Sequence, residues 1–122
     1  MTKQITRLFV HAKMSQRLQR LHQLLESSPN DSFALFALAK EYEGLQDAEQ
    51  ALAYYFRLRA LDPGYVGLYY HLGKLLEKTG QPDAALKTYR QGMDVAKQAG
   101  DMHAYSELNV ARMDLDDPDG DE

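Results

Sequence analysis

The sequence predicts an all-α protein, a solenoid of about six helices stacked as antiparallel pairs. Residues recur at a fixed offset of 34, and apolar residues follow helical spacing between these landmarks. The recurring pairs are Pro29 and Pro63, Leu38 and Leu72, Ala51 and Ala85, Leu52 and Leu86, and Tyr55 and Tyr89. Because the offset carries helix-breaking as well as apolar residues, one supersecondary unit is repeated, and such units bury their faces by stacking.

The composition is that of an ordinary globular protein. Of the 122 residues, 44% are apolar and 26% are charged, and none is cysteine. The lack of cysteine excludes disulfides, zinc ribbons and thiol nucleophiles. No stretch approaches the ~18 uninterrupted apolar residues of a membrane span. We therefore expect a soluble protein with no membrane partner and no cofactor, and a cytoplasmic location by default.

Charge is distributed unevenly along the chain. Residues 1–25 carry five bases and no acid, whereas residues 101–122 carry eight acids and one base, and the net charge is −4. Nucleic-acid binding requires a basic patch on the folded body, which is acidic here, so no nucleic-acid partner is expected. Residues 1–14 lack a helical period and an N-cap, and residues 116–122 contain no apolar residue. We expect a flexible basic tail and a disordered acidic tail.

The first predicted helix covers residues 15–28. Leu18, Leu21, Leu24 and Leu25 form one apolar stripe that ends before Pro29. Met14 stands directly before this helix and is an alternative start of the protein.

The second predicted helix covers residues 32–43. Asn30 and Asp31 offer N-caps at its start, and Gly44 can adopt the left-handed conformation that closes a helix. The third helix begins after Asp47, with Gln50 at the position of a capping-box partner, and continues to the Asp-Pro pair at residues 62 and 63.

The last three predicted helices cover residues 65–78, 82–99 and 101–115. Thr79 and Gly80 end the fourth helix, and Pro82 stands in the first turn of the fifth, where proline is tolerated. Gly100 and Asp101 then separate the fifth helix from the sixth. The sixth carries one apolar stripe with a largely polar back, which is typical of a capping helix. This stripe consists of Ala104, Leu108, Ala111 and Leu115.

At this spacing the helices resemble tetratricopeptide repeats (TPRs), as in small bacterial proteins of that family. Two full repeats, 32–65 and 66–98, follow a half-repeat at 15–29 and precede the capping helix at 101–115. The matched signature positions are Leu35, Leu38, Ala39, Tyr42, Ala51, Tyr55 and Pro63 in the first repeat, and Tyr69, Leu72, Gly73, Leu76, Ala85 and Tyr89 in the second, with Gly80 at the turn glycine. Gln46 stands where the first repeat would usually have that glycine. In the capping helix Leu108 is the equivalent of Leu72, although the 34-residue offset would place that equivalent at residue 106.

The resemblance implies a right-handed α-solenoid that acts as a non-catalytic scaffold. Proteins of this family typically bind an extended peptide or a partner helix in a concave groove lined by the first helix of each repeat. The resemblance places the following residues in that groove: Phe33, Phe36, Lys40, Glu43, Tyr70, His71, Lys74 and Glu77. Three pairs of them recur at the 34-residue offset: Phe36 and Tyr70, Lys40 and Lys74, and Glu43 and Glu77.

The functional interpretation of this set is that its aromatic residues anchor a ligand and its lysines hold carboxylates or carbonyl groups. An alternative is that the lysines and glutamates are ordinary i, i+3 surface pairs, worth only ~0.2–0.5 kcal/mol each. The aromatic residues could instead be covered by the sixth helix or by the N-terminal tail.

No residue pattern indicates catalysis or metal binding, so no enzyme activity is expected. The four histidines, His11, His22, His71 and His103, are too scattered for metal-ligand spacing. The alternative to a peptide-binding scaffold is a structural protein that forms homodimers. Two repeats leave the solenoid ends poorly covered, and the helix at 15–28 lacks a first-helix partner that a second copy could supply.

Overall fold

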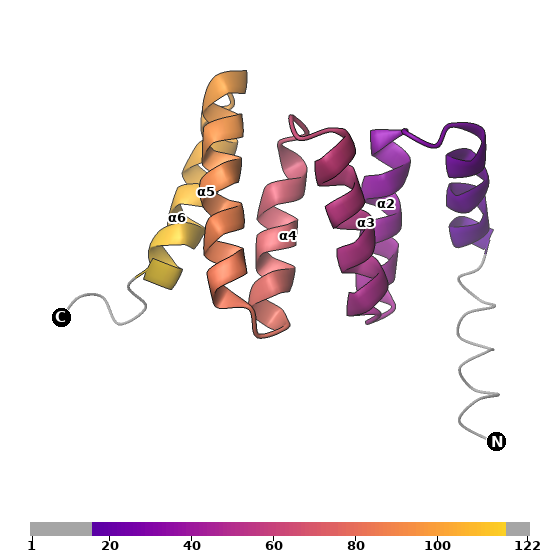
Figure 1. Cartoon of the computed structure of the whole chain (residues 1–122), viewed down its shortest axis with the longest axis horizontal. Coiled ribbons are helices and arrows are strands. Elements are labelled where there is room, and N and C mark those ends of the chain that lie inside the picture. Colours follow the sequence, from indigo (N-terminus) through magenta and orange to yellow (C-terminus); the bar gives the residue numbers. More distant parts are fainter. Residues whose placement is uncertain (1–15, 117–122) are drawn as a thin grey trace, which may run out of the picture.

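The computed structural model describes residues 16–116, which contain six helices and no strand. A helix over residues 16–27 comes first. It is followed by α2 (Ser32–Gly44), α3 (Ala48–Leu61), α4 (Gly67–Lys78), α5 (Pro82–Ala99) and α6 (Met102–Asp116). The helices stand side by side in a row, each antiparallel to the next along the chain (Figure 1). The predicted all-α solenoid is confirmed. The tail predicted at residues 1–14, and residues 117–122 of the acidic tail, lie outside the described range.

Aspartate side chains begin three of the helices. The Oδ1 atoms of Asp31, Asp47 and Asp101 each accept a hydrogen bond from the backbone N–H three residues later, at 3.1, 3.2 and 3.0 Å. These bonds satisfy N–H groups that have no partner inside the helix. The caps predicted from the sequence are therefore present.

The start of α4 differs from its prediction by two residues. The sequence placed it at Tyr65, whereas the structure begins it at Gly67. The N–H groups of Leu68 and Tyr69 donate to the carbonyl groups of Tyr65 and Val66, three residues earlier. This spacing is that of a tight turn and not of an α-helix, so the chain enters α4 through a turn with no side-chain cap.

The left-handed residue after α2 is Gln46, and the prediction of Gly44 is wrong. Gln46 has a φ of +62°, and it lies 34 residues before Gly80, which has a φ of +79°. After α2, the N–H of Asp47 donates to the carbonyl of Tyr42; after α4, that of Gln81 donates to Leu76. These bonds form only when the left-handed residue lies at a fixed distance from the last helical turn. Its position is therefore set by the repeat register and not by where the nearest glycine stands in the sequence.

Gln46→Gly is expected to stabilise the protein by about 0.5–1 kcal/mol. Removing a side chain from the left-handed region gains about 1–2 kcal/mol, and the greater conformational freedom of glycine in the unfolded chain offsets part of this gain. Gly80→Ala, at the equivalent turn, should destabilise it by about 1 kcal/mol. Urea unfolding of both variants measures the two free energies. Equal changes of the same sign would contradict this account of the turn.

The core consists of buried leucines and alanines around three fully buried tyrosines, Tyr55, Tyr69 and Tyr89. Glycines allow these large rings to fit. A Cβ added to Gly73 would lie 2.2 Å from Cε1 of Tyr89, and one added to Gly92 would lie 2.5 Å from Cβ of Tyr69. The Tyr69 hydroxyl donates to the carbonyl of Pro63 at 2.5 Å, which ties α4 to the loop that follows α3.

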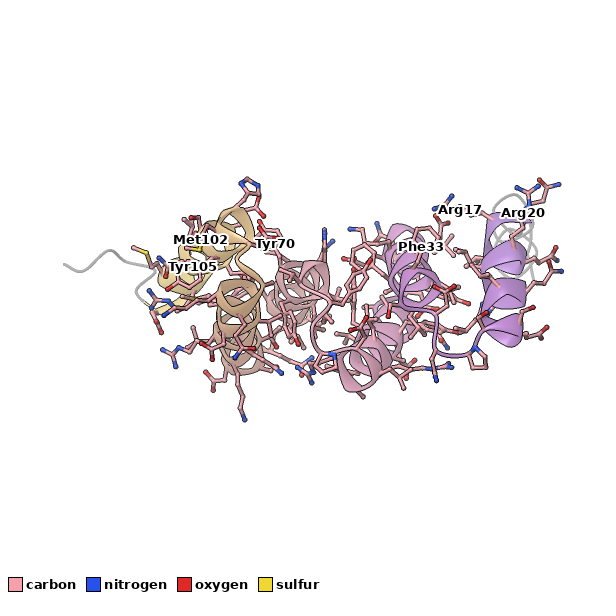
Figure 2. The ribbon with its side chains drawn as sticks, turned by 90° about the horizontal axis from the view of Figure 1, so that it is seen from above. Arg17, Arg20, Phe33, Tyr70, Met102 and Tyr105 are labelled. Atoms are coloured by element: carbon pink, nitrogen blue, oxygen red, sulfur yellow. The ribbon has the colours of Figure 1, made fainter. Side chains whose placement is uncertain are left out.

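The α6 end of the solenoid carries both apolar and charged side chains. Met102 lies at this end (Figure 2), and Met102 and Met113 of α6 are 56% and 52% exposed. Leu108 and Ala111 of α6 are buried against the preceding helices. The adjoining side of α6 carries Arg112, which donates to Asn109 Oδ1 at 2.9 Å and to Asp116 Oδ2 at 2.6 Å. Arg90 of α5 also reaches Asp116 Oδ2, at 3.2 Å. Asp116, which the sequence analysis assigned to the disordered tail, is therefore the last residue of α6 and is held by two arginines.

Candidate functional site

The exposed sides of α2, α4 and α6 form one surface, here called the α2–α4–α6 face. Its residues are Phe33, Phe36, Lys40 and Glu43 on α2; Tyr70, His71, Lys74 and Glu77 on α4; and His103, Ser106, Glu107 and Val110 on α6. Within each helix every one of these residues lies three or four positions from another member of the set, which places them on one side of that helix. Figure 2 shows Phe33 and Tyr70 along the same edge of the molecule. The eight residues predicted for the groove are the α2 and α4 part of this face.

Phe36 is half-buried in an aromatic cluster and does not stand free as an anchor. Its ring centroid lies 5.4 Å from that of Tyr65, 5.5 Å from that of His71 and 6.2 Å from that of Tyr55. The cluster therefore joins the two repeats, and Phe36 contributes mainly to packing between them. The aromatic residue of α2 that is open to solvent is Phe33, which is 62% exposed.

The lysines of the face are paired with glutamates of their own helix. Lys40 Nζ lies 3.6 Å from Glu43 Oε1, and Lys74 Nζ lies 3.8 Å from Glu77 Oε2. The alternative interpretation of these residues as i, i+3 pairs therefore describes their geometry correctly. A ligand carboxylate would have to compete with a neighbouring glutamate for each lysine.

Each of these glutamates is also held by a core tyrosine. The Tyr55 hydroxyl donates to Glu43 Oε1 at 2.5 Å, and the Tyr89 hydroxyl donates to Glu77 Oε2. Burial, together with this hydrogen bond, raises the pKa of both tyrosines far above the ordinary value, so both remain donors. This contact was not predicted, although both partners recur at the 34-residue offset.

His71 connects the lysine of α2 with the aromatic residues of α4. Its Nδ1 lies 3.2 Å from Lys40 Nζ, and its ring lies 5.9 Å from that of Tyr70. Burial, and then the charge of Lys40, lower the pKa of His71, while Glu43 and Glu107 act in the opposite direction. The neutral imidazole can accept a hydrogen bond from Lys40, and the imidazolium cannot.

Lowering the pH from about 7 to about 5 is expected to reduce the free energy of unfolding, in part through His71. Its pKa is lower in the folded state, so the unfolded chain binds the proton first and gains stability as pH falls through about 6.5. His71→Gln should therefore show a smaller loss than the unsubstituted chain in urea unfolding at the two pH values. An equal loss in His71→Gln and in the unsubstituted chain would contradict this role of His71.

A hollow of about 320 Å³ lies between α4 and α6 on this face. It is lined by Tyr70, His103, Ser106, Glu107 and Val110. Val110 is 59% exposed, and Lys74 Nζ lies 5.6 Å from the centroid of the Tyr70 ring, close enough for a cation–π contact. The sequence analysis did not assign any α6 residue to the groove, because α6 is displaced by two residues from the repeat register.

Two features are absent from the described residues: a cluster of metal-ligating side chains and a membrane-spanning helix. Over residues 16–116, no three His, Cys, Asp or Glu side chains are grouped so that they could hold a metal ion. None of the helices in that range has the length and apolar character needed to cross a membrane.

Comparisons with known proteins agree on the family. A family profile described as tetratricopeptide repeat matches residues 42–106, more than half of the chain. The TPR repeat-containing protein PA0015 of Pseudomonas aeruginosa is 29% identical over 99 residues, which cover 81% of this chain and 94% of that protein. The solution structure of a tetratricopeptide repeat domain protein from Salinibacter ruber has a TM-score of 0.70 and 42% identity, with 78% of this chain and 93% of that chain covered. Protein BPP2914 from Bordetella parapertussis has a TM-score of 0.70 and 27% identity, with 83% and 88% covered.

Proposed function

We propose that this chain, which belongs to the tetratricopeptide-repeat family, is a non-catalytic scaffold that binds a segment of a partner protein along its α2–α4–α6 face. The fold generally mediates interactions between proteins. The observation that carries the proposal is the hollow between α4 and α6, where Tyr70 and Val110 offer apolar surface beside polar side chains. Pockets of this kind accept an anchoring side chain of the partner.

The charges of the face favour a ligand that is anchored by an apolar side chain over one that is held through its carboxylate. Lys40 and Lys74 already have glutamate partners, so they contribute orientation and selectivity more than affinity. Phe33 is open to solvent at the other end of the face and supplies a second apolar contact. An extended segment or a helix with two apolar residues would therefore match the face.

Site-specific photocrosslinking in cells of the source organism tests the proposal. A photoreactive amino acid at position 106, inside the hollow, is expected to yield discrete adducts with one or a few proteins. The same amino acid at position 98, on the exposed side of α5, is the matched control and should not yield those adducts. Val110→Asp should abolish the adducts formed from position 106, because a charge in the hollow opposes apolar anchoring. Identical adducts from both positions, or adducts unaffected by Val110→Asp, would contradict the proposal.

Self-association through the solenoid ends has less support. At the α6 end, Asn109 and Arg112 are the equivalents of Gly73 and Leu76, which lie 36 residues earlier. In α4 these two positions face the following helix, so in α6 they face the open end of the solenoid. A second copy that packed there would have to bury the charge of Arg112. At the other end, Arg17 occupies the position equivalent to Ala51 and pairs with Glu41 at 2.6 Å. Sedimentation at increasing protein concentration should therefore show a monomer, and a dimer would favour the alternative.

A further inference from the structure

The opposite side of the solenoid carries a second groove, between α3 and α5. Viewed from above, α3 and α5 lie on the other side of the stack from α2 and α6 (Figures 1 and 2). The groove has a volume of about 460 Å³. Its lining includes Phe56 and Arg59 from α3, Leu76 from α4, and Gln81, Lys87 and Gln91 from the start and middle of α5.

Phe56 gives this groove an apolar wall. Its side chain is 40% exposed, and the guanidinium carbon of Arg59 lies 5.2 Å from the centroid of its ring. This cation–π contact holds Arg59 along the wall, with its charge at the mouth of the groove. The buried side chain of Leu76 adds apolar surface to the lining.

The two cations of the groove differ from those of the α2–α4–α6 face. Among residues 16–116, neither Arg59 nor Lys87 has a carboxylate within 4 Å, whereas Lys40 and Lys74 each have one. No acidic side chain lines the groove. It therefore combines an exposed aromatic ring with two positive charges, one on α3 and one on α5, that have no carboxylate within 4 Å in the described part of the chain.

We propose that the α3–α5 groove binds an acidic segment of a partner protein, in which an apolar side chain is flanked by carboxylates. The apolar side chain would pack against Phe56 and Leu76, and the carboxylates would pair with Arg59 and Lys87. A free phosphate would use the cations but leave the apolar wall exposed to water. Two cations are also too few for the phosphate contacts on which nucleic-acid affinity depends.

The occupancy of this groove is independent of the proposed function of the α2–α4–α6 face. The two surfaces share no residue and lie on opposite sides of the solenoid, so the protein could bind partners on both at once. Loss of binding at one surface should leave the other intact, and the failure of one proposal can therefore be distinguished from the failure of the other.

Titration of the isotope-labelled full chain with a short peptide tests the inference by NMR. The probe is an amidated peptide with one leucine between two pairs of glutamates, and its control carries glutamine in place of every glutamate. We expect the acidic peptide to shift backbone amides of residues 56–60 and 84–91 at millimolar concentration, and the glutamine peptide to bind at least tenfold more weakly. No shifts, equal binding of the two peptides, or shifts confined to α2 and α6 would overturn the proposal.

Substitutions in the groove separate its two components. Arg59→Gln combined with Lys87→Gln should weaken binding of the acidic peptide at least tenfold, whereas Lys97→Gln, at the exposed end of α5, should leave it unchanged. Phe56→Ala should weaken binding of the same peptide, and circular dichroism would verify that each variant is folded. If inorganic phosphate caused the same shifts and displaced the peptide, the groove would bind anions in general, and the proposal would be overturned. Shifts of the same amides that appear without peptide and grow with protein concentration would also overturn it, because a second copy of the chain would then occupy the groove.

Discussion

Replacing Gly92 with alanine is expected to lower the free energy of unfolding by about 2 kcal/mol. The added Cβ would lie 2.5 Å from Cβ of Tyr69 and 3.0 Å from Cδ1 of Leu108, at the junction of α4, α5 and α6. Tyr69 and Leu108 are buried, and the Tyr69 Cβ is fixed to the backbone, so α4 and α5 must separate. Such overpacking costs about 1–3 kcal/mol or more, which exceeds the gain of about 1 kcal/mol in helix propensity.

Gly44→Ala is the matched control for this variant. Gly44 also lies in a helix, but an added Cβ would meet no atom within 4 Å. This substitution should leave the stability unchanged or raise it by up to about 1 kcal/mol. Urea unfolding followed by far-UV circular dichroism compares the two variants. Equal stability of the two would show that the helices tolerate a wider spacing than the structure indicates.

Tyr69→Ala is expected to destabilise the protein by about 3–5 kcal/mol, because it empties the space of a fully buried aromatic side chain. Tyr69→Phe keeps the ring and removes the hydroxyl that donates to Pro63, so it should cost about 1 kcal/mol. The pair of variants, measured by urea unfolding, separates packing from the hydrogen bond. A cost of Tyr69→Phe as large as that of Tyr69→Ala would contradict the packing argument.

The two substitutions should not be additive. Alanine at position 69 keeps the Cβ that lies 2.5 Å from the Cβ added at Gly92, but the space emptied by the tyrosine ring lets α4 shift and relieve this contact. Gly92→Ala should then cost much less than in the unsubstituted chain, with a coupling energy of about 1–3 kcal/mol in a double-mutant cycle. Additive costs would show that the emptied ring space does not relieve the contact between the two Cβ atoms.

The 34-residue offset predicted most of the fold, because packing within and between repeats is encoded by residues at fixed spacing. It located the helices and the small residues that admit Tyr89 against Gly73, whereas the aspartate caps were predicted from residue type at the helix starts. The prediction of Gly44 failed because it followed residue type and not the offset, which pairs Gln46 with Gly80. The start of α4 was also misplaced, because a turn with i to i+3 bonds has no distinctive sequence there.

The candidate site was predicted less completely. The offset brought the α2 and α4 residues onto one face, but exposure depends on neighbours that are distant in the chain. Phe36 is covered because Tyr65 in the loop and His71 in α4 pack against it. The hollow beside α6 and the α3–α5 groove each combine residues from different helices, so neither has a signature within a single segment.

The charged network of Arg112 on α6 restricts the ways in which this protein could lengthen by duplication. A helix added after α6 would have to cover Arg112, and a buried charge that loses its partners destabilises a protein by several kcal/mol. A copy of residues 66–98 inserted in front of α6 would avoid this cost, because α6 would still provide the last surface of the array. Growth of such an array is therefore expected by internal duplication, with the same terminal helix retained at its end.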